Sequence, residues 1–144
     1  MSNFDPDTFL DTAVDTELST EFIPVPEGEY VAVIDDLQMK PTRKGGMMVM
    51  VKWSIDDAAV ASETGRDNNT VTQMIFLDLT AEGQLDTAKG KNIKLGKLRD
   101  VFNQNSSGHS LRELLGNSAR IMVTHTASDD GEMTYTNVNS VTAL

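Results

Sequence analysis

The 144-residue chain contains no cysteine. This absence excludes disulfides, thiolate nucleophiles, iron–sulfur clusters and cysteine-based zinc sites. Only two histidines are present, His109 and His125, so a histidine-rich metal site is nearly excluded as well. Aromatic residues make up only 6% of the chain, which leaves few rings to line a large apolar pocket. We therefore expect no metal and no other cofactor.

Long apolar segments are also missing. The longest unbroken apolar run, residues 47–51, is far shorter than the roughly 20 residues that a membrane-spanning helix needs. The first residues show neither the basic nor the apolar segment of a secretory signal. The length, with 39% hydrophobic and 24% charged residues, is typical of one globular domain. We expect a soluble protein of a reducing compartment with no membrane partner.

Positive charge is scarce, because 12 lysines and arginines stand against 22 aspartates and glutamates, a formal net charge of −10. The imbalance is local. Residues 1–30 hold eight of the acidic residues and no basic one, which leaves 14 acidic and 12 basic residues, a net charge of −2, for residues 31–144. The net charge of the whole chain therefore does not exclude a polyanionic ligand.

Residues 1–26 are predicted to form an acidic N-terminal arm. Asp5 followed by Pro6 is typical of a helix N-cap with proline at the first helical position. The apolar residues that follow, as far as Val14, could share one face of a short helix. A disordered arm agrees equally well with this composition.

Residues 27–144 have the pattern of a mainly β domain. The expected strands are residues 30–39, 47–55, 71–79, 119–126 and 133–141. Residues 56–70 are expected to be irregular, residues 93–102 to form an amphipathic helix, and Ser110 with Glu113 to open a helical turn through a capping box. Five strands with a helix between the third and fourth are the element order of an OB-fold, which other small α+β folds share. We predict a five-stranded OB-fold-like barrel.

No arrangement of residues indicates catalysis. The nucleophile elbow, the Walker A loop, the dinucleotide fingerprint and the His-Glu-x-x-His motif are all absent. Asp35 and Asp36 are adjacent on a strand, so their side chains point to opposite faces. A magnesium site from Asp35, Asp56 and Asp78 would need the fold to bring them together, and nothing in their spacing requires it. We expect no enzymatic activity, and we expect His125 to be a packed or surface residue.

Two clusters of basic residues favour a phosphate-bearing ligand. Lys40, Arg43 and Lys44 lie in the loop between the first two strands, and five more bases precede or lie on the helix: Lys89, Lys91, Lys94, Lys97 and Arg99. Such clusters suit nucleic acid, because each neutralised phosphate releases counterions. A solubilising surface is the alternative interpretation, and the acidic turn at residues 129–132 counts against binding.

Binding of single strands also needs exposed rings on which bases stack. The candidates are Trp53, Tyr135, Phe76 and Tyr30, each of which could equally belong to the core. Trp53 and Tyr135 are preferred because polar residues flank them. The predicted nucleic-acid-binding residues are therefore Lys40, Arg43, Lys44, Lys52, Trp53, Lys89, Lys91, Lys94 and Tyr135.

Several short motifs resemble small phage-encoded proteins of the single-stranded-DNA-binding type. The motifs are VPEGEYVAVI at residues 25–34, Lys-Gly-Gly at 44–46, Phe-Leu-Asp-Leu at 76–79, Lys-Leu-Arg at 97–99 and Leu-Leu-Gly at 114–116. The resemblance implies an OB-fold that coats single-stranded DNA. We expect such a protein to act in phage replication or recombination in the host cytoplasm, as a homo-oligomer or a cooperative array.

Many single-strand binders carry an acidic C-terminal tail that recruits replication proteins, whereas here the acidic segment is N-terminal. Residues 3–21 are a candidate for the same task, either on replication or recombination proteins or on the chain's own basic clusters. A merely solvated arm is the alternative. A competing interpretation of the whole chain is a virion structural or assembly protein. Its arm would dock on a neighbouring subunit through four apolar anchors: Phe4, Phe9, Leu10 and Phe22.

Overall fold

A computed structural model describes residues 4–144; residues 1–3, the start of the predicted arm, lie outside the described part. The elements are α1 (Pro6–Asp11), β1 (Gly28–Pro41), β2 (Met47–Ile55), α2 (Ala58–Thr64), β3 (Asn69–Phe76), α3 (Ile93–Val101), a 3-10 turn η1 (Leu111–Leu114), β4 (Ser118–Ala127) and β5 (Thr134–Thr142). The strands form one antiparallel sheet in the order β3-β2-β1-β4-β5. The predicted mainly β, five-stranded architecture is confirmed.

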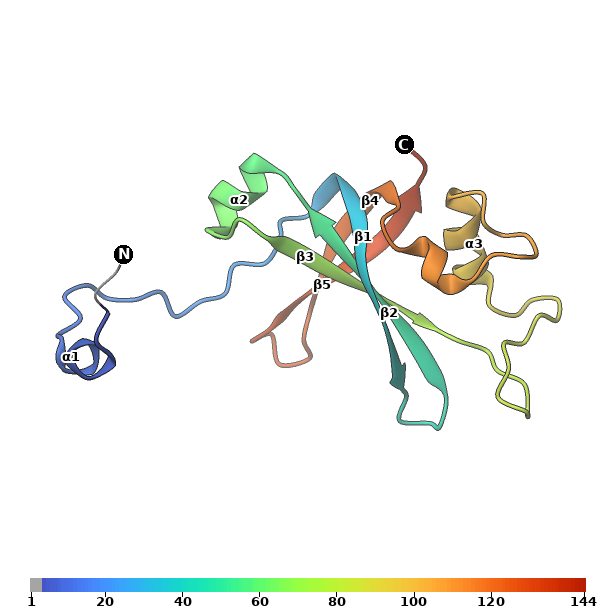
Figure 1. The fold of residues 1–144 in the computed structure, drawn as a ribbon, viewed down its shortest axis with the longest axis horizontal. Helices are drawn as coiled ribbons and strands as arrows, with labels where there is room; N and C mark the ends of the chain where they lie inside the picture. The colour runs from blue at the N-terminus through green and yellow to red at the C-terminus, as the bar shows by residue number, and fades with distance from the viewer. Residues whose placement is uncertain (1–3) are drawn as a thin grey trace.

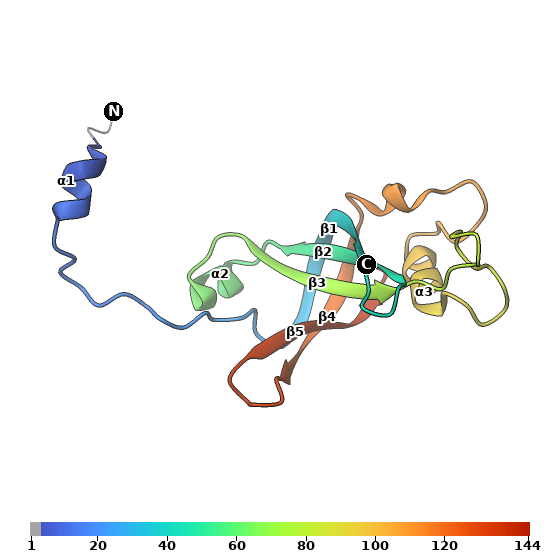
Figure 2. The same cartoon turned by 90° about the horizontal axis from the view of Figure 1, so that it is seen from below.

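The long strand β1 joins the two halves of this sheet. Its residues 28–33 pair with β4 and its residues 32–41 pair with β2. The register shifts between Ile34 and Asp36, so a bulge at Asp35 brings Ile34 and Leu37 to the same, inner side. The bulge increases the local twist, and the sheet coils around its core (Figures 1 and 2).

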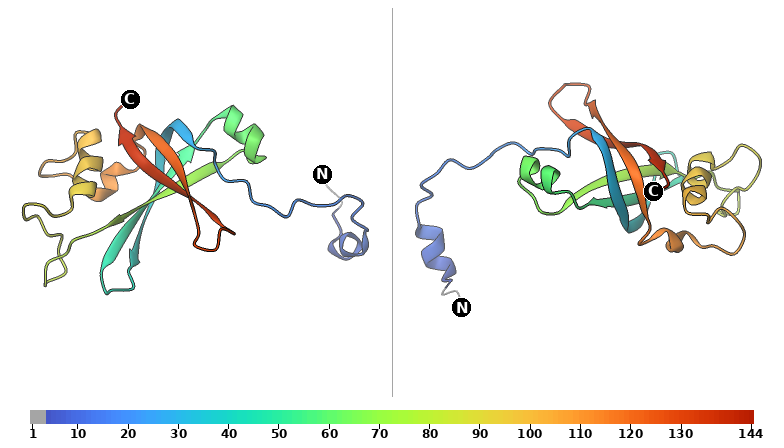
Figure 3. Two further views of the ribbon diagram at one scale, coloured as in Figure 1. Left: turned by 180° about the vertical axis from the view of Figure 1, so that it is seen from behind. Right: turned by 90° about the horizontal axis from the view of Figure 1, so that it is seen from above.

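The core fills the concave side of the coiled sheet. Strand β2 shows the underlying alternation: Val49, Val51, Trp53 and Ile55 are buried, and the residues between them face outward. Two leucines of α3, Leu95 and Leu98, and Leu114 of η1 complete the core from one end. This end is where Figure 3 shows α3 and η1 against the sheet.

The sheet is not a closed barrel, which corrects the prediction of a barrel. Strands β3 and β5 are its two edges and come close to each other, yet no ladder of hydrogen bonds joins them. At one end the Lys94 ammonium donates to the Met74 carbonyl of β3 at 3.1 Å, and at the other a groove separates residues 70–72 from residues 134–137. The Lys94 side chain at one end and a groove at the other therefore stand where strand pairing would close the barrel.

Helix α2 lies within residues 56–70, a segment that was expected to have no regular secondary structure. Asp57 caps its N-terminus by accepting hydrogen bonds from the backbone N–H groups of Ala59 and Val60 at 2.9 and 3.1 Å. Gly65 ends it in the left-handed conformation with φ of 75°. The helix is only seven residues long, and too few apolar positions fall in it to produce a visible periodicity.

Replacing Asn69 with alanine is expected to lower the free energy of unfolding by about 1–3 kcal/mol, because the buried Thr64 hydroxyl and the partly buried Arg66 carbonyl would lose their hydrogen-bond partner. The Asn69 Oδ1 accepts from the Thr64 hydroxyl at 2.9 Å, and its Nδ2 donates to the Arg66 carbonyl at 2.8 Å. Urea denaturation followed by circular dichroism measures the change. Asn68→Ala, at an exposed neighbouring position, is the control and should stay within about 0.5 kcal/mol of wild type. Equal losses for both variants would contradict this account.

The arm is exposed along residues 4–23 and is held at its C-terminal end. Helix α1 begins as predicted, with the Asp5 side chain accepting from the Asp7 backbone N–H, and ends at Asp11. The Arg66 guanidinium donates to the Ile23 carbonyl at 2.8 Å and lies 4.2 Å from the centre of the Phe22 ring. Val25 is buried, and His125 contacts its carbonyl through Nε2 at 2.6 Å.

Candidate nucleic-acid interface

The outer face of β1, β2 and β3 brings together residues that are far apart in the sequence. Antiparallel pairing places side chains of one face directly beside each other across the strands. The registers define three such rows on this face: Asp36, Lys52 and Thr72; Gln38, Met50 and Met74; and Lys40, Met48 and Phe76. The face therefore carries an apolar patch, with Lys40 in one of its rows and Lys52 in the row beside it.

We call Met48, Met50, Met74 and Phe76 the methionine–phenylalanine patch. Phe76 is 65% exposed and Met74 is 47% exposed, which is unusual for such large apolar side chains at neighbouring positions of a sheet. Phe76 is a weaker candidate than Trp53 from sequence alone, and the methionines are not among the residues predicted to bind. The alternation along β2 and β3 could have identified the patch. Its four residues lie between the buried positions of these strands and therefore face outward.

Two grooves run across this patch and meet at Met74. The first, of about 660 Å³, lies between the β1–β2 loop and the patch; it is lined by residues 40–44, Met48, Met74 and Phe76. The second, of about 560 Å³, lies between β3 and β5 and includes Met50, Met74, Thr126 and Tyr135. The Tyr135 ring is 49% exposed there. Met74 lines both grooves, and Phe76 lines the first while Tyr135 lines the second.

A compact turn presents the first cluster of basic residues. The Thr42 backbone N–H donates to the Gly46 carbonyl, and the Gly46 N–H donates to the Thr42 hydroxyl, both at 2.9 Å. Gly45 takes a φ of 82°, which favours glycine. The side chains of Lys40, Arg43 and Lys44 are exposed around this turn and line the first groove. The structure therefore brings all three predicted residues to the edge of the patch.

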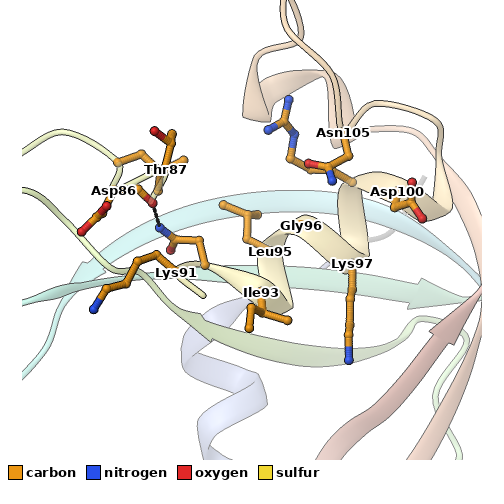
Figure 4. Close-up of a pocket in the computed structure, with 12 residues that line it drawn as sticks. Asp86, Thr87, Lys91, Ile93, Leu95, Gly96, Lys97, Asp100 and Asn105 are labelled. Atoms are coloured by element: carbon orange, nitrogen blue, oxygen red, sulfur yellow. Dashed lines mark hydrogen bonds between the residues drawn. The ribbon is translucent and has the colours of Figure 1, made fainter. Parts of the chain in front are cut away.

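The second basic cluster does not act as one surface. Lys94 reaches the free edge of β3, because its Nζ donates to the Met74 backbone carbonyl, and it lines neither groove of the patch. Lys91 and Lys97 line a cleft beside α3 that also contains Asp86 and Asp100 (Figure 4). Arg99 holds the loop after α3 in place, since its guanidinium donates to the backbone carbonyls of Ser106 and His109 at 3.2 Å.

The loop that carries Lys89 and Lys91 is fastened to the end of β3. The Asn92 side chain accepts from the Asp78 backbone N–H at 2.8 Å and donates to the Asp78 carbonyl at 2.9 Å, while the Asp78 carboxylate accepts from the Asn92 backbone N–H. Both lysines are exposed. The loop thus holds Lys89 and Lys91 on the α3 side of the sheet, at the end of β3 that follows Phe76.

Trp53 corrects the prediction that it stacks on bases. Its side chain is 0% exposed, and its indole N–H donates to the Gln73 side-chain oxygen at 3.1 Å. It lies on the inner face of β2, whereas its neighbour Lys52 is exposed on the outer face. Trp53 is a core residue because the alternation of β2 turns every odd-numbered position from Val49 to Ile55 inward.

Tyr30 also serves the structure rather than a binding face. Its ring packs against the core, and its hydroxyl donates to the Pro26 carbonyl at 2.8 Å. Burial raises the pKa of Tyr30, and the negative charges of Asp57 and Glu63 add to the rise. The neutral hydroxyl therefore remains a hydrogen-bond donor at the point where the arm joins the sheet.

The β4–β5 loop places negative charge next to the second groove. The Ser128 hydroxyl and the Glu132 backbone N–H both donate to Asp130, and these hydrogen bonds lower the pKa of its carboxyl group. Asp129 and Glu132 are exposed in the same loop. This loop therefore adds negative charge beside the Thr134 and Tyr135 end of the second groove.

The described carboxylates and histidines form no metal centre. Among residues 4–144, no three His, Asp or Glu side chains come together as metal ligands. Asp35, Asp56 and Asp78, which could have formed a magnesium site, are therefore not gathered. The same residues include no helix that is long and apolar enough to cross a membrane.

The fold and the surface define a class of protein: a small mainly β domain built on an open five-stranded antiparallel sheet, with an apolar groove bordered by lysine and arginine. The chain belongs to the family described as protein of unknown function (DUF669), whose model matches residues 11–144. The match includes every strand of the sheet and the arm from Asp11 onward. No curated protein is found to match the chain.

Proposed function

We propose that this domain is an OB-fold with an open seam between β3 and β5, and that it binds single-stranded DNA on the outer face of β2 and β3. The strand order, the close approach of the two edge strands and the position of α3 between β3 and β4 support this fold. The observation that carries the function is the methionine–phenylalanine patch, which lies between Lys40 and Lys52 and beside Arg43 and Lys44.

Each part of the surface has a distinct task in this proposal. Lys40, Arg43, Lys44 and Lys52 neutralise phosphates, and Lys89, Lys91 and Lys94 extend the positive potential on the α3 side. Phe76 and Tyr135 provide faces on which bases stack, and the methionines fill the space between bases as adaptable apolar contacts. Stacking and phosphate contacts tolerate every base, so binding is expected to be independent of sequence.

Replacing Phe76 with alanine is the direct test. We expect a loss of about 1–3 kcal/mol in binding free energy, or roughly 5- to 150-fold in affinity, because one stacking face is removed. Fluorescence anisotropy of a labelled oligo-dT, titrated at low and at moderate salt, measures this loss. Phe22→Ala is the matched control, since it removes an exposed phenyl ring (76% exposed) that lies outside both grooves.

The oligo-dT titrations distinguish DNA binding from a function in protein–protein assembly. Wild-type protein should bind with an affinity that falls as salt is raised, at a slope of about −0.7 per neutralised phosphate. Absence of binding at low salt would refute the proposed function. An equal effect of Phe76→Ala and Phe22→Ala would refute the assignment of the patch as the binding surface.

A second candidate function is assembly with other proteins through the arm, either as a virion component or with replication or recombination proteins. The observation that favours it is the exposure of large apolar side chains along residues 4–23, which contact no other element of the described chain closely enough to be buried. The resemblance to phage proteins supports a site of action in the host cytoplasm for either function.

A further inference from the structure

The arm exposes an apolar surface that its own domain leaves uncovered. Large apolar side chains are exposed at seven positions in residues 4–23: Phe4, Phe9, Leu10, Val14, Leu18, Phe22 and Ile23. Six acidic residues and no basic residue lie in the same segment. A surface that is both apolar and acidic is complementary to an apolar site with a basic rim.

Helix α1 concentrates both properties. The rings of Phe4 and Phe9 contact each other with centroids 5.0 Å apart, and Leu10 is 79% exposed beside them. The acidic residues of the helix and its cap are Asp5, Asp7 and Asp11. Helix α1 and the residues just before it thus present a cluster of two rings and a leucine among three carboxylates.

The first groove has the complementary composition. Met48, Met74 and Phe76 supply its apolar surface, and Lys40, Arg43 and Lys44 supply its positive charge. Among the described residues, no acidic side chain lines this groove. The three cations of the groove equal in number the three carboxylates of α1 and its cap. Both surfaces also carry large apolar side chains that can pack against each other.

The attachment of the arm determines which copy of the groove α1 can reach. The arm is held at Phe22 and Ile23 by Arg66, beside α2 and at the end of β2 opposite to the first groove. From there it leads away from the sheet (Figures 1 and 3). Nine residues of β2 span about 30 Å, and residues 12–22 reach at most about 40 Å when fully extended. Docking within one chain would require the arm to reverse and run back, almost fully extended, along the sheet.

We propose that α1 of one copy docks in the first groove of a second copy, with Phe9 and Leu10 against Met74 and Phe76, and with the carboxylates of α1 beside the basic rim. The contact joins two different surfaces, so it is heterologous and can continue from copy to copy. This inference goes beyond DNA binding and does not rest on it, because it is tested on the protein alone.

A charge-exchange experiment tests the contact. One full-length variant carries a reversed arm (Asp5→Lys, Asp7→Lys, Asp11→Lys), and the other a reversed groove (Lys40→Glu, Arg43→Glu, Lys44→Glu). Sedimentation velocity at low salt should show that the average mass of wild type rises with concentration. Each variant alone should remain monomeric, because like charges then face each other. Mixing the two variants should restore association, since each arm again meets a groove of opposite charge.

The control variant reverses three exposed carboxylates outside the arm and the groove: Glu63→Lys, Glu82→Lys and Glu132→Lys. It changes the net charge as much as the reversed arm does and should associate like wild type. Phe9→Ser with Leu10→Ser should abolish association while leaving every charge in place. A wild-type chain that is monomeric at all concentrations overturns the proposal, and so does a mixture of the two variants that stays monomeric.

Discussion

Replacing Trp53 with alanine is expected to lower the free energy of unfolding by about 3–5 kcal/mol, a large part of the stability of a domain of this size. The indole is completely buried on the inner face of β2, and its removal leaves a cavity in the core. The Gln73 side chain, only 6% exposed, would also lose the indole N–H that it accepts. Urea denaturation monitored by far-ultraviolet circular dichroism measures the loss.

The same tryptophan separates a core role from a binding role. Trp53→Phe should cost less than Trp53→Ala, because it keeps most of the buried volume. Neither variant should alter the affinity of the folded protein for oligo-dT, and the fluorescence of wild-type Trp53 should not be quenched by DNA. A Trp53→Ala variant that stays as stable as wild type but loses affinity for DNA would contradict its assignment to the core.

Neutralising the β1–β2 loop is expected to lower the affinity for single-stranded DNA by about 100-fold at 0.1 M salt. The variant carries Lys40→Gln, Arg43→Gln and Lys44→Gln. Each phosphate contact on a single strand contributes about 0.7 to the slope of log affinity against log salt, so the loss of three contacts flattens the slope by about 2. Anisotropy titrations of labelled oligo-dT at several salt concentrations give both quantities.

The matched control removes three cations that line neither groove on the outer face: Lys97→Gln, Arg112→Gln and Arg120→Gln. It alters the net charge by the same amount, so any general electrostatic effect appears in both variants. The control should keep a slope close to that of wild type. Equal slopes for the two variants would show that the β1–β2 loop makes no special contact with the DNA backbone.

The sequence predicted the strands well because each combines β-forming residues with a clear turn at its end. Strand β2 matches its predicted bounds, and the capping box of Ser110 and Glu113 forms as expected. Strand β3 ends at Phe76, three residues before its predicted end, because Asp78 is drawn into hydrogen bonds with Asn92. Helix α2 was missed because its stability comes from the Asp57 cap and from burial of Val60 and Thr64, which no short pattern reveals.

The binding face was only partly predictable. Lys40 at the end of β1 and Arg43 and Lys44 in the following loop are close in sequence, so their clustering is visible without a structure. The patch depends on which face of a strand is buried and on the register between β2 and β3. A single ring such as Trp53 shows neither which face of its strand is buried nor how the strands are paired. Polar neighbours do not show that the ring is exposed, because polar and apolar residues alternate along any strand with one buried face. Phe76 and Met74 become neighbours of the basic loop through pairings that the sequence does not specify.

The position of β1 between the two halves of the sheet has a consequence for the order in which the domain folds. Short loops join β1 to β2 and β4 to β5, and β2 is joined to β3 through α2, so both groups can form early from nearby residues. The halves meet only when Gly28 pairs with Val123, which closes a loop of nearly the whole domain. Until then the edge of β1 that pairs with β4 and the inner face of β2 with Trp53 are open to water. Association of nascent chains through this edge therefore competes with completion of the native sheet.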